Sequence, residues 1–144
     1  MRGRVSLAVG RAPLVADLGL EDAGVRTERG FVVVDAALRT SVPEVSAIGD
    51  MVGPVMLAHA ASEQGVRVAE VIAGRRTEAA LDAAAIPMCV YCQPEVAAVG
   101  LTEAQARERG EVTVGKFPFR ALGKAMATGF TEGFVKVVCG ARHG

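Results

Sequence analysis

The chain has 144 residues, and its 16 Lys and Arg balance its 16 Asp and Glu, so that the formal net charge at pH 7 is zero. This balance argues against a nucleic-acid partner, because phosphate binding requires a basic face. Hydrophobic residues make up 51% of the chain, which is enough for a core of Val, Ala and Leu, and no apolar run reaches the roughly 18–20 residues of a membrane span.

The first part of the chain, residues 1–76, is predicted to combine short strands with one helix. From residue 58 to 73, small apolar residues recur every three or four positions with polar ones between them. This period indicates an amphipathic helix that ends at Gly74. Runs of Val, Leu and Ile bounded by Gly, Pro or Asp predict three strands, at 5–9, 30–35 and 45–50.

A second part, residues 86–144, follows a connector at 74–85 and is predicted to be α+β. Thr102 and Gln105 have the spacing of a capping box, and Gly110 stands where the helix is expected to end. The sequence thus predicts an α/β strand–loop–helix segment followed by an α+β segment with an antiparallel sheet. Its β-branched runs predict four strands, at 87–92, 96–100, 112–119 and 133–139.

Cys89 and Cys92 have the Cys-x-x-Cys spacing that is used for thiol–disulfide exchange and for zinc. In a strand, residues three apart point to opposite faces and lie about 10 Å apart, whereas a disulfide requires Cα atoms within about 6.8 Å of each other. No second Cys or His pair completes a zinc site. We therefore predict that both thiols are reduced and unbridged, and we assign no metal site.

The cysteine count and the N-terminus bear on the compartment. Three cysteines, an odd number, fit a reducing environment better than a disulfide framework. The N-terminal stretch has two early arginines, only a short apolar run and no small-residue cleavage pattern, and so lacks the features of a signal peptide. We expect a cytoplasmic protein with no membrane partner.

The stretch with the most chemical information runs from Arg39 to Gly65. A predicted strand ends in Gly49-Asp50, and a helix begins a few residues later at Ala58. In an open α/β sheet, ligands bind at the carboxyl ends of the strands, where a carboxylate can accept hydrogen bonds from a sugar or ribitol hydroxyl. The helix N-terminus adds unpaired backbone N–H groups and a partial positive charge. The same pattern also describes a plain strand–loop–helix unit with a surface aspartate.

Several motifs resemble those of one enzyme family. The pattern Thr40-x-x-Pro43-x-x-x-Ala47-Ile48-Gly49-Asp50 resembles the second FAD-contact motif of the flavoprotein disulfide oxidoreductases, which are also called pyridine nucleotide-disulfide oxidoreductases. Residues 56–59, Met-Leu-Ala-His, follow at the distance seen in the dihydrolipoamide dehydrogenase branch, and residues 86–106 and 114–138 are similar to that branch as well. The resemblance covers nearly the whole chain but only part of a family member.

The resemblance implies a role for each matching residue. Asp50 would hold the FAD ribitol, and the helix that follows would direct its N-terminus at the pyrimidine end of the flavin and stabilise negative charge on the reduced ring. Gly10 matches the glycine near the NAD site, although the family's usual Arg-Arg-Pro-Asn is Arg-Ala-Pro-Leu in this sequence. Four residues would lie along the flavin: Met56, Leu57, Ala58 and His59.

The resemblance also implies a fold and partners. It implies an incomplete FAD-domain strand–loop–helix segment over residues 1–76, the C-terminal part of the FAD/NAD-binding region. A truncated dimerisation domain would follow over residues 86–144 and pair two chains into a homodimer. Members of this branch oxidise dihydrolipoamide to lipoamide with NAD through FAD. They work with components of 2-oxo acid dehydrogenase complexes or of the glycine cleavage system.

Parts of that reaction's machinery are absent from the sequence. No two cysteines are five apart, no Gly-x-Gly-x-x-Gly occurs, and no C-terminal His-x-His-Pro stretch is present. We therefore assign no catalytic residue and expect the chain alone to be inactive. Two alternatives stay open: a non-catalytic remnant or pairing module, and a segment of a related mercuric- or glutathione-type reductase.

Overall fold

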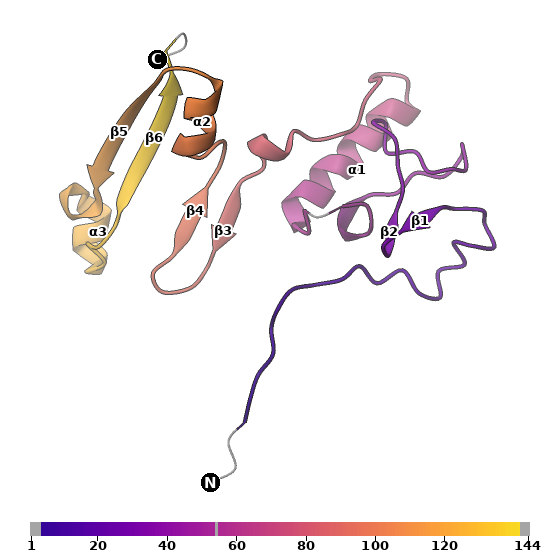
Figure 1. The fold of residues 1–144 in the computed structure, drawn as a ribbon, viewed down its shortest axis with the longest axis horizontal. Helices are drawn as coiled ribbons and strands as arrows, with labels where there is room; N and C mark the ends of the chain where they lie inside the picture. The colour runs from indigo at the N-terminus through magenta and orange to yellow at the C-terminus, as the bar shows by residue number, and fades with distance from the viewer. Residues whose placement is uncertain (1–3, 54, 142–144) are drawn as a thin grey trace. The chain divides into compact units, whose positions relative to one another are not determined.

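The structure, a computed structural model, describes residues 4–53 and 55–141. The chain divides into a first unit, Met1–Ile86, and a second unit, Pro87–Gly144. The first unit contains one small antiparallel sheet and the second contains two, each together with helices, so the mixed α/β character expected from the sequence is confirmed (Figure 1). Within the described ranges, none of the helices has the length and apolar character needed to cross a membrane.

The first unit is built around one long helix and a small two-stranded sheet. Helix α1 spans Ala58–Ile72, and strands β1 and β2 pair antiparallel, with Thr27 opposite Val32. The remaining elements are short: β1 Thr27–Glu28, β2 Phe31–Val32, the 3-10 turn η1 Gly49–Met51 and the 3-10 turn η2 Ala83–Ala85.

Helix α1 confirms the sequence prediction at both ends. It begins after Leu57, whose backbone is extended, and its C-cap residue is Ala73. Gly74 follows with φ +67°, a left-handed conformation that glycine adopts without the strain of a Cβ, and its N–H donates to the carbonyl of Val71 at 3.0 Å. The periodic small residues therefore define the helix, and the glycine ends it.

The buried side chains of the first unit form two small clusters. In one, Leu38 packs with Val68 of α1 and with Ala79. Ala79 is fully buried, and the N–H groups of Ala79 and Ala80 both donate to the carbonyl of Ala36 at 2.9 Å. Part of the predicted connector is thus packed into the first unit. The other cluster contains Val25, Val32 and Ala47.

Two of the strands predicted in the first unit are absent from the structure, and a third is shortened. The stretch 5–9 is not a strand: Val5, Leu7 and Val9 are 96, 82 and 87% exposed, and within the described ranges no segment is paired with it. The run 30–35 shortens to β2. An apolar run forms a strand only where a neighbour supplies ladder hydrogen bonds.

Local hydrogen bonds explain where the other two runs stop. The Asp35 carboxylate accepts from the N–H groups of Ala37 and Arg39 at 2.8 and 2.9 Å, so that the chain turns at the end of the predicted run 30–35. In the run 45–50, only Ser46 forms a bridge, with Arg39. The chain then enters the 3-10 turn η1 in place of the predicted strand end.

The second unit follows the predicted order, with three strands shorter than predicted and the last one, residues 134–140, displaced by one residue. Strand β3 pairs antiparallel with β4, and β5 pairs antiparallel with β6 from Val112 opposite Gly140 to Pro118 opposite Phe134. Helix α3, which ends at Gly129 with φ +79°, was not predicted. The elements are β3 Met88–Val90, β4 Val96–Ala98, α2 Glu103–Arg109, β5 Val112–Pro118, the 3-10 turn η3 Phe119–Ala121, α3 Gly123–Thr128 and β6 Phe134–Gly140.

The predicted capping box of α2 is confirmed. The N–H of Gln105 donates to Thr102 Oγ1 at 3.3 Å, and the N–H of Thr102 donates to Gln105 Oε1 at 3.0 Å. Glu103, in the first turn, pairs with Arg107 at 2.7 Å and with Lys136 of β6 at 3.5 Å. Helix α2 is therefore attached to the β5–β6 sheet through an exposed charge network.

This network predicts a pH dependence. The hydrogen bond from Arg107 lowers the pKa of Glu103, and the charges of Arg107 and Lys136 act in the same direction. A lowered folded-state pKa means that the stabilisation is present above the ordinary glutamate pKa of about 4.3 and is lost as pH falls through the folded value. We expect α2 to loosen from β6 in that acidic range. The amide NMR signals of both elements, recorded as a function of pH, measure this transition. Glu103→Gln should remove this transition and Glu108→Gln on the same helix should not; an unchanged transition in Glu103→Gln would contradict the assignment.

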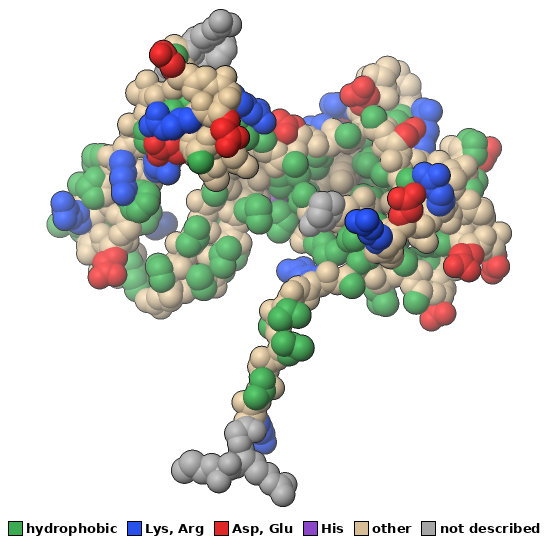
Figure 2. Space-filling model, viewed as in Figure 1, with side chains coloured by type: hydrophobic (Ala, Val, Ile, Leu, Met, Phe, Trp, Pro, Cys, Tyr) green, Lys and Arg blue, Asp and Glu red, His purple; other side chains and the backbone are tan. Residues whose placement is uncertain are grey.

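The second unit has no deeply buried side chain among its described residues 87–141. Figure 2 shows apolar side chains spread over the visible surface of this unit. The unit therefore exposes apolar surface that it does not itself cover. The large apolar side chains that are about half exposed or more include Met88, Val90, Val96, Phe117, Phe130, Val135 and Val137.

Candidate functional site

The turn that carries Asp50 is a 3-10 turn whose first residue, Gly49, has a left-handed backbone conformation. Ile48 is extended, Gly49 has φ +76°, and the N–H of Val52 closes the turn on the carbonyl of Gly49 at 3.1 Å. This conformation favours glycine at position 49, since a residue with a Cβ would destabilise the turn by about 1–2 kcal/mol. Asp50 follows at once and is exposed, so that its carboxylate faces solvent rather than the core.

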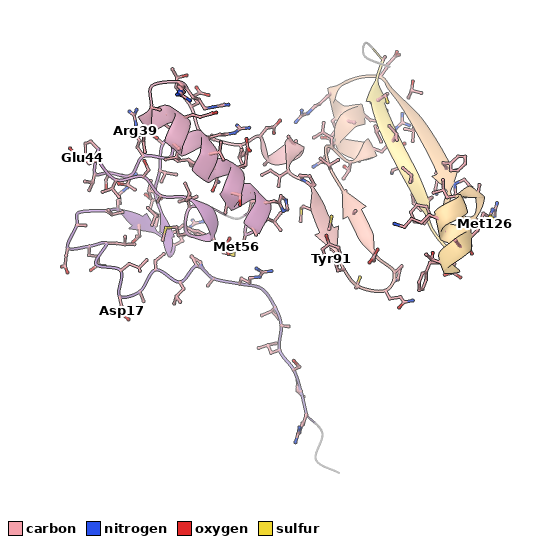
Figure 3. All side chains as sticks on the ribbon, turned by 180° about the vertical axis from the view of Figure 1, so that it is seen from behind. Asp17, Arg39, Glu44, Met56, Tyr91 and Met126 are labelled. Atoms are coloured by element: carbon pink, nitrogen blue, oxygen red, sulfur yellow. The ribbon has the colours of Figure 1, made fainter. Side chains whose placement is uncertain are left out.

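The start of helix α1 is the second part of the site. Met56 and Leu57 are half-buried, whereas Ala58 and His59 are exposed. The N-cap residue, Leu57, forms no side-chain hydrogen bond, and the first turn of α1 contains no acidic residue. Figure 3 shows Met56 beside the first turn of α1. A helix start presents backbone N–H groups and a partial positive charge to any anionic or acceptor group placed against it.

The turn and the helix are held together by Gln64, a residue that the sequence reasoning missed. Its side-chain oxygen accepts from the N–H of Gly49 at 2.7 Å, across fifteen positions of the chain. A Cβ on Gly49 would lie 3.4 Å from the Cβ of Ala61, so the turn also packs directly on the helix. The structure thus brings the Asp50 turn and helix α1 into one packed element.

The cavity beside this contact is small. Gly49, Val52 and Gln64 are among the residues that line a space of about 170 Å³. Pockets that enclose a small molecule are typically about 300–1,000 Å³. The described residues beside this contact therefore do not enclose a ligand by themselves. The Asp50 turn and the start of helix α1 are together called the wall below.

Gly10 lies apart from this wall in the sequence and has its own backbone signature. It has φ +139°, and no described residue comes within 4 Å of the position that a Cβ would occupy. The conformation explains why glycine stands here. A role of Gly10 at an NAD site stays a prediction.

The side chains of the two cysteines in the Cys-x-x-Cys pattern interact with different residues. Cys89 lies in β3 opposite Ala97, and its thiol raises the pKa of Tyr91, first through the negative charge of the thiolate and then through a hydrogen bond between the two side chains. Cys92 was predicted to lie in a strand over 87–92, but β3 ends at Val90 and Cys92 lies in the bend that follows. Its thiol donates to the carbonyl of Pro94 at 3.0 Å. Both are free in the structure. Among the described residues, no cluster of three or more His, Cys, Asp or Glu side chains could hold a metal ion.

This arrangement predicts the oxidation state of the thiols. We expect the purified chain to take up alkylating reagent at Cys89, Cys92 and Cys139 when it is denatured without a reductant. Intact-mass analysis before and after reduction checks the expectation. A gain of two alkyl groups that appears only after reduction would reveal a bridge and overturn it.

Two parts of the chain match known protein domains. Residues 3–65 match the pyridine nucleotide-disulphide oxidoreductase domain, and residues 86–144 match the dimerisation domain of the same group. The chain therefore belongs to the pyridine nucleotide-disulphide oxidoreductase family. The resemblance inferred from residues 40–50 and 56–59 is thereby confirmed at the level of the family.

Several curated proteins that are similar to the chain are dihydrolipoyl dehydrogenases. The chain is 49% identical over 139 residues to that of Zymomonas mobilis, covering 96% of this chain and 30% of the relative. It is 50% identical over 137 residues to that of Thermus scotoductus, covering 94% of this chain and 29% of the relative. The chain thus spans about 30% of the length of the curated relatives it matches.

Solved structures give the same family. The Cu(II) complex of RclA, a HOCl-induced flavoprotein disulfide reductase of Escherichia coli, superposes with a TM-score of 0.83 at 31% identity, over 94% of this chain and 32% of that one. LpdA of Mycobacterium tuberculosis superposes with a TM-score of 0.75 at 30% identity, over 89% of this chain and 28% of that one. Proteins of this family use FAD and NAD.

Proposed function

We propose that this chain is the part of a dihydrolipoyl dehydrogenase that supplies one wall of the flavin site and the dimer interface. The observation that carries the proposal is the packing of the Asp50 turn on helix α1, whose N-cap residue Leu57 forms no side-chain hydrogen bond. It occurs in a chain that is 49% identical to the dihydrolipoyl dehydrogenase of Zymomonas mobilis.

In this proposal each residue of the wall has a distinct task toward FAD. The exposed Asp50 carboxylate accepts hydrogen bonds from ribitol hydroxyl groups, and Met56 contributes apolar contact. Leu57, Ala58 and His59 present the start of α1 to the ring, where the helix end stabilises negative charge by about 0.3–1 kcal/mol, or up to about 2 kcal/mol when partly buried. For a two-electron couple, about 2 kcal/mol corresponds to roughly 40 mV. Bound FAD supplies the electron transfer between the dithiol substrate and NAD.

The second unit serves dimerisation in the same proposal. Residues 86–144 match a dimerisation domain, and the described part of the second unit exposes apolar side chains that a partner copy would cover. We extend the proposal to the partners of the whole enzyme, namely components of a 2-oxo acid dehydrogenase complex or of glycine cleavage, and to NAD binding near Gly10. We extend it further to a cytoplasmic location, because three cysteines, an odd number, fit a reducing compartment better than a disulfide framework.

The isolated chain is expected to purify colourless and to be inactive in dihydrolipoamide-dependent NAD reduction. The wall offers two or three hydrogen bonds to FAD, each contributing a net ~0.5–1.5 kcal/mol, against several kcal/mol of lost translational and rotational freedom. The sequence also has no pair of cysteines five apart to relay electrons. Visible absorbance and an NADH assay check both points; a yellow chain with stoichiometric FAD would contradict the first, and turnover lost in Asp50→Ala would contradict the second.

The function itself is tested in a full-length setting. In the Zymomonas mobilis relative, the 139 aligned positions are replaced by those of this chain to give a full-length protein, called the graft below. The graft should form a dimer, retain FAD and reduce NAD with dihydrolipoamide. A graft that folds and dimerises but binds no FAD would favour a non-catalytic pairing module instead.

A further inference from the structure

We propose that Gln64 is a positioning residue that fixes the Gly49–Asp50 turn against helix α1, so that Asp50 and the helix start meet the flavin as one rigid element. The inference rests on the proposed function, because it concerns the same flavin wall. Its basis is the hydrogen bond from the Gly49 N–H to the Gln64 side chain, 2.7 Å long and partly buried.

The bond replaces a missing N-cap. Gly49 is the first residue of a 3-10 turn, so its N–H has no partner inside the turn, and Ile48 in the N-cap position forms no side-chain hydrogen bond. Only the oxygen of the Gln64 amide can accept from a backbone N–H, which fixes the orientation of that amide. Helix α1 therefore caps the neighbouring turn with a side chain of its own.

Close packing on the same helix face supports the cap. A Cβ on Gly49 would meet the Cβ of Ala61 at 3.4 Å, and a Cβ on Gly65 would meet Ile48 Cδ1 at 3.4 Å. Residues three and four apart share a face of a helix. Ala61, Gln64 and Gly65 therefore form one surface on which the turn rests, with the hydrogen bond fixing its register.

Positioning matters because the two flavin contacts come from different elements. Asp50 belongs to the turn, whereas Leu57, Ala58 and His59 belong to the start of α1. A ligand that must touch both loses affinity when one moves relative to the other, since a binding site is effective only when its supporting contacts hold it in place. Gln64 itself need not touch the flavin.

The test compares three variants of the graft by FAD titration of the apoprotein and by the flavin reduction potential. Gln64→Met keeps the length of the side chain but removes the acceptor, and should weaken FAD binding about 3- to 10-fold, the worth of one hydrogen bond. Gln64→Glu keeps an acceptor and should stay within about twofold of the unmodified graft. Arg67→Met is the matched control, because Arg67 anchors the same helix elsewhere through a 2.9 Å bond to the carbonyl of Ala80.

The outcomes separate this inference from the proposed function. An unmodified graft without FAD overturns the proposed function and the flavin role of Gln64 with it. A yellow graft in which Gln64→Met binds FAD normally, or in which Gln64→Glu fails to restore binding, overturns the positioning role alone. So does an equal loss in Arg67→Met, which would reveal general destabilisation of α1. If Gln64→Met does not fold, Gln64→Asn replaces it, because its shorter side chain withdraws the acceptor from Gly49.

Discussion

Asp50→Ala in the graft is expected to weaken FAD binding by about 10- to 100-fold, because hydrogen bonds to a charged group contribute about 1.5–3 kcal/mol. Asp50 is exposed at the tip of a short turn, so its removal leaves the core intact. The effect should therefore appear in FAD affinity and not in the thermal stability of the apoprotein. Titration of apoprotein with FAD, followed by flavin fluorescence, measures it.

Two further variants test whether the loss of FAD binding is specific to the charge and position of Asp50. Asp50→Asn retains one acceptor oxygen without the charge and should fall between the graft and Asp50→Ala. Asp22→Ala removes an exposed carboxylate from the same unit, outside the proposed wall, and should leave FAD binding unchanged. Equal affinities for Asp50→Ala and Asp22→Ala would remove Asp50 from the flavin site.

Leu38→Ala is expected to lower the free energy of unfolding of the first unit by about 2–4 kcal/mol, in the range of large-to-small core substitutions. Leu38 is 5% exposed and joins the segment before the Asp50 turn to Val68 of α1 and to Ala79. Removing its side chain opens a cavity at the point where three segments of the unit meet. Urea unfolding of the isolated chain, followed by circular dichroism, measures the change.

The backbone at this position supplies an internal check. Leu38 has φ +60°, a conformation that costs a side chain about 1–2 kcal/mol and costs glycine little. Leu38→Gly should therefore be no more destabilising than Leu38→Ala, although it removes more atoms. Leu18→Ala, at a residue that is 54% exposed, is the surface control. A loss for Leu18→Ala as large as that for Leu38→Ala would contradict the assigned core.

The elements that could be predicted from the sequence are those whose signals are local. Helix α1 shows its period and its terminal glycine, and α2 shows its capping box. Strands β5 and β6 were predicted because each is a β-branched run that finds its partner within the same unit. The run 5–9 has the same local character but no paired neighbour among the described residues, and strand formation depends on that neighbour.

Other features could not be predicted from the sequence, either because they depend on residues far apart in the chain or because the element is too short to show a periodic pattern. Helix α3 is six residues long, and Gly129 after it was the one available sign of its end. Asp50 and residues 56–59 could be proposed from a motif, since they lie close together in the sequence. Gln64 could not, because its proposed role depends on a hydrogen bond to a backbone N–H fifteen positions away. No local residue pattern predicts such a bond.

If this chain forms one wall of a flavin site, the purified graft must contain FAD, and its FAD content is the decisive measurement. We expect a folded, dimeric, yellow protein with stoichiometric FAD, and a marked loss of FAD when Asp50 is changed to alanine. A folded and dimeric graft that purifies colourless and gains no flavin on titration with FAD would show that the chain does not form this wall.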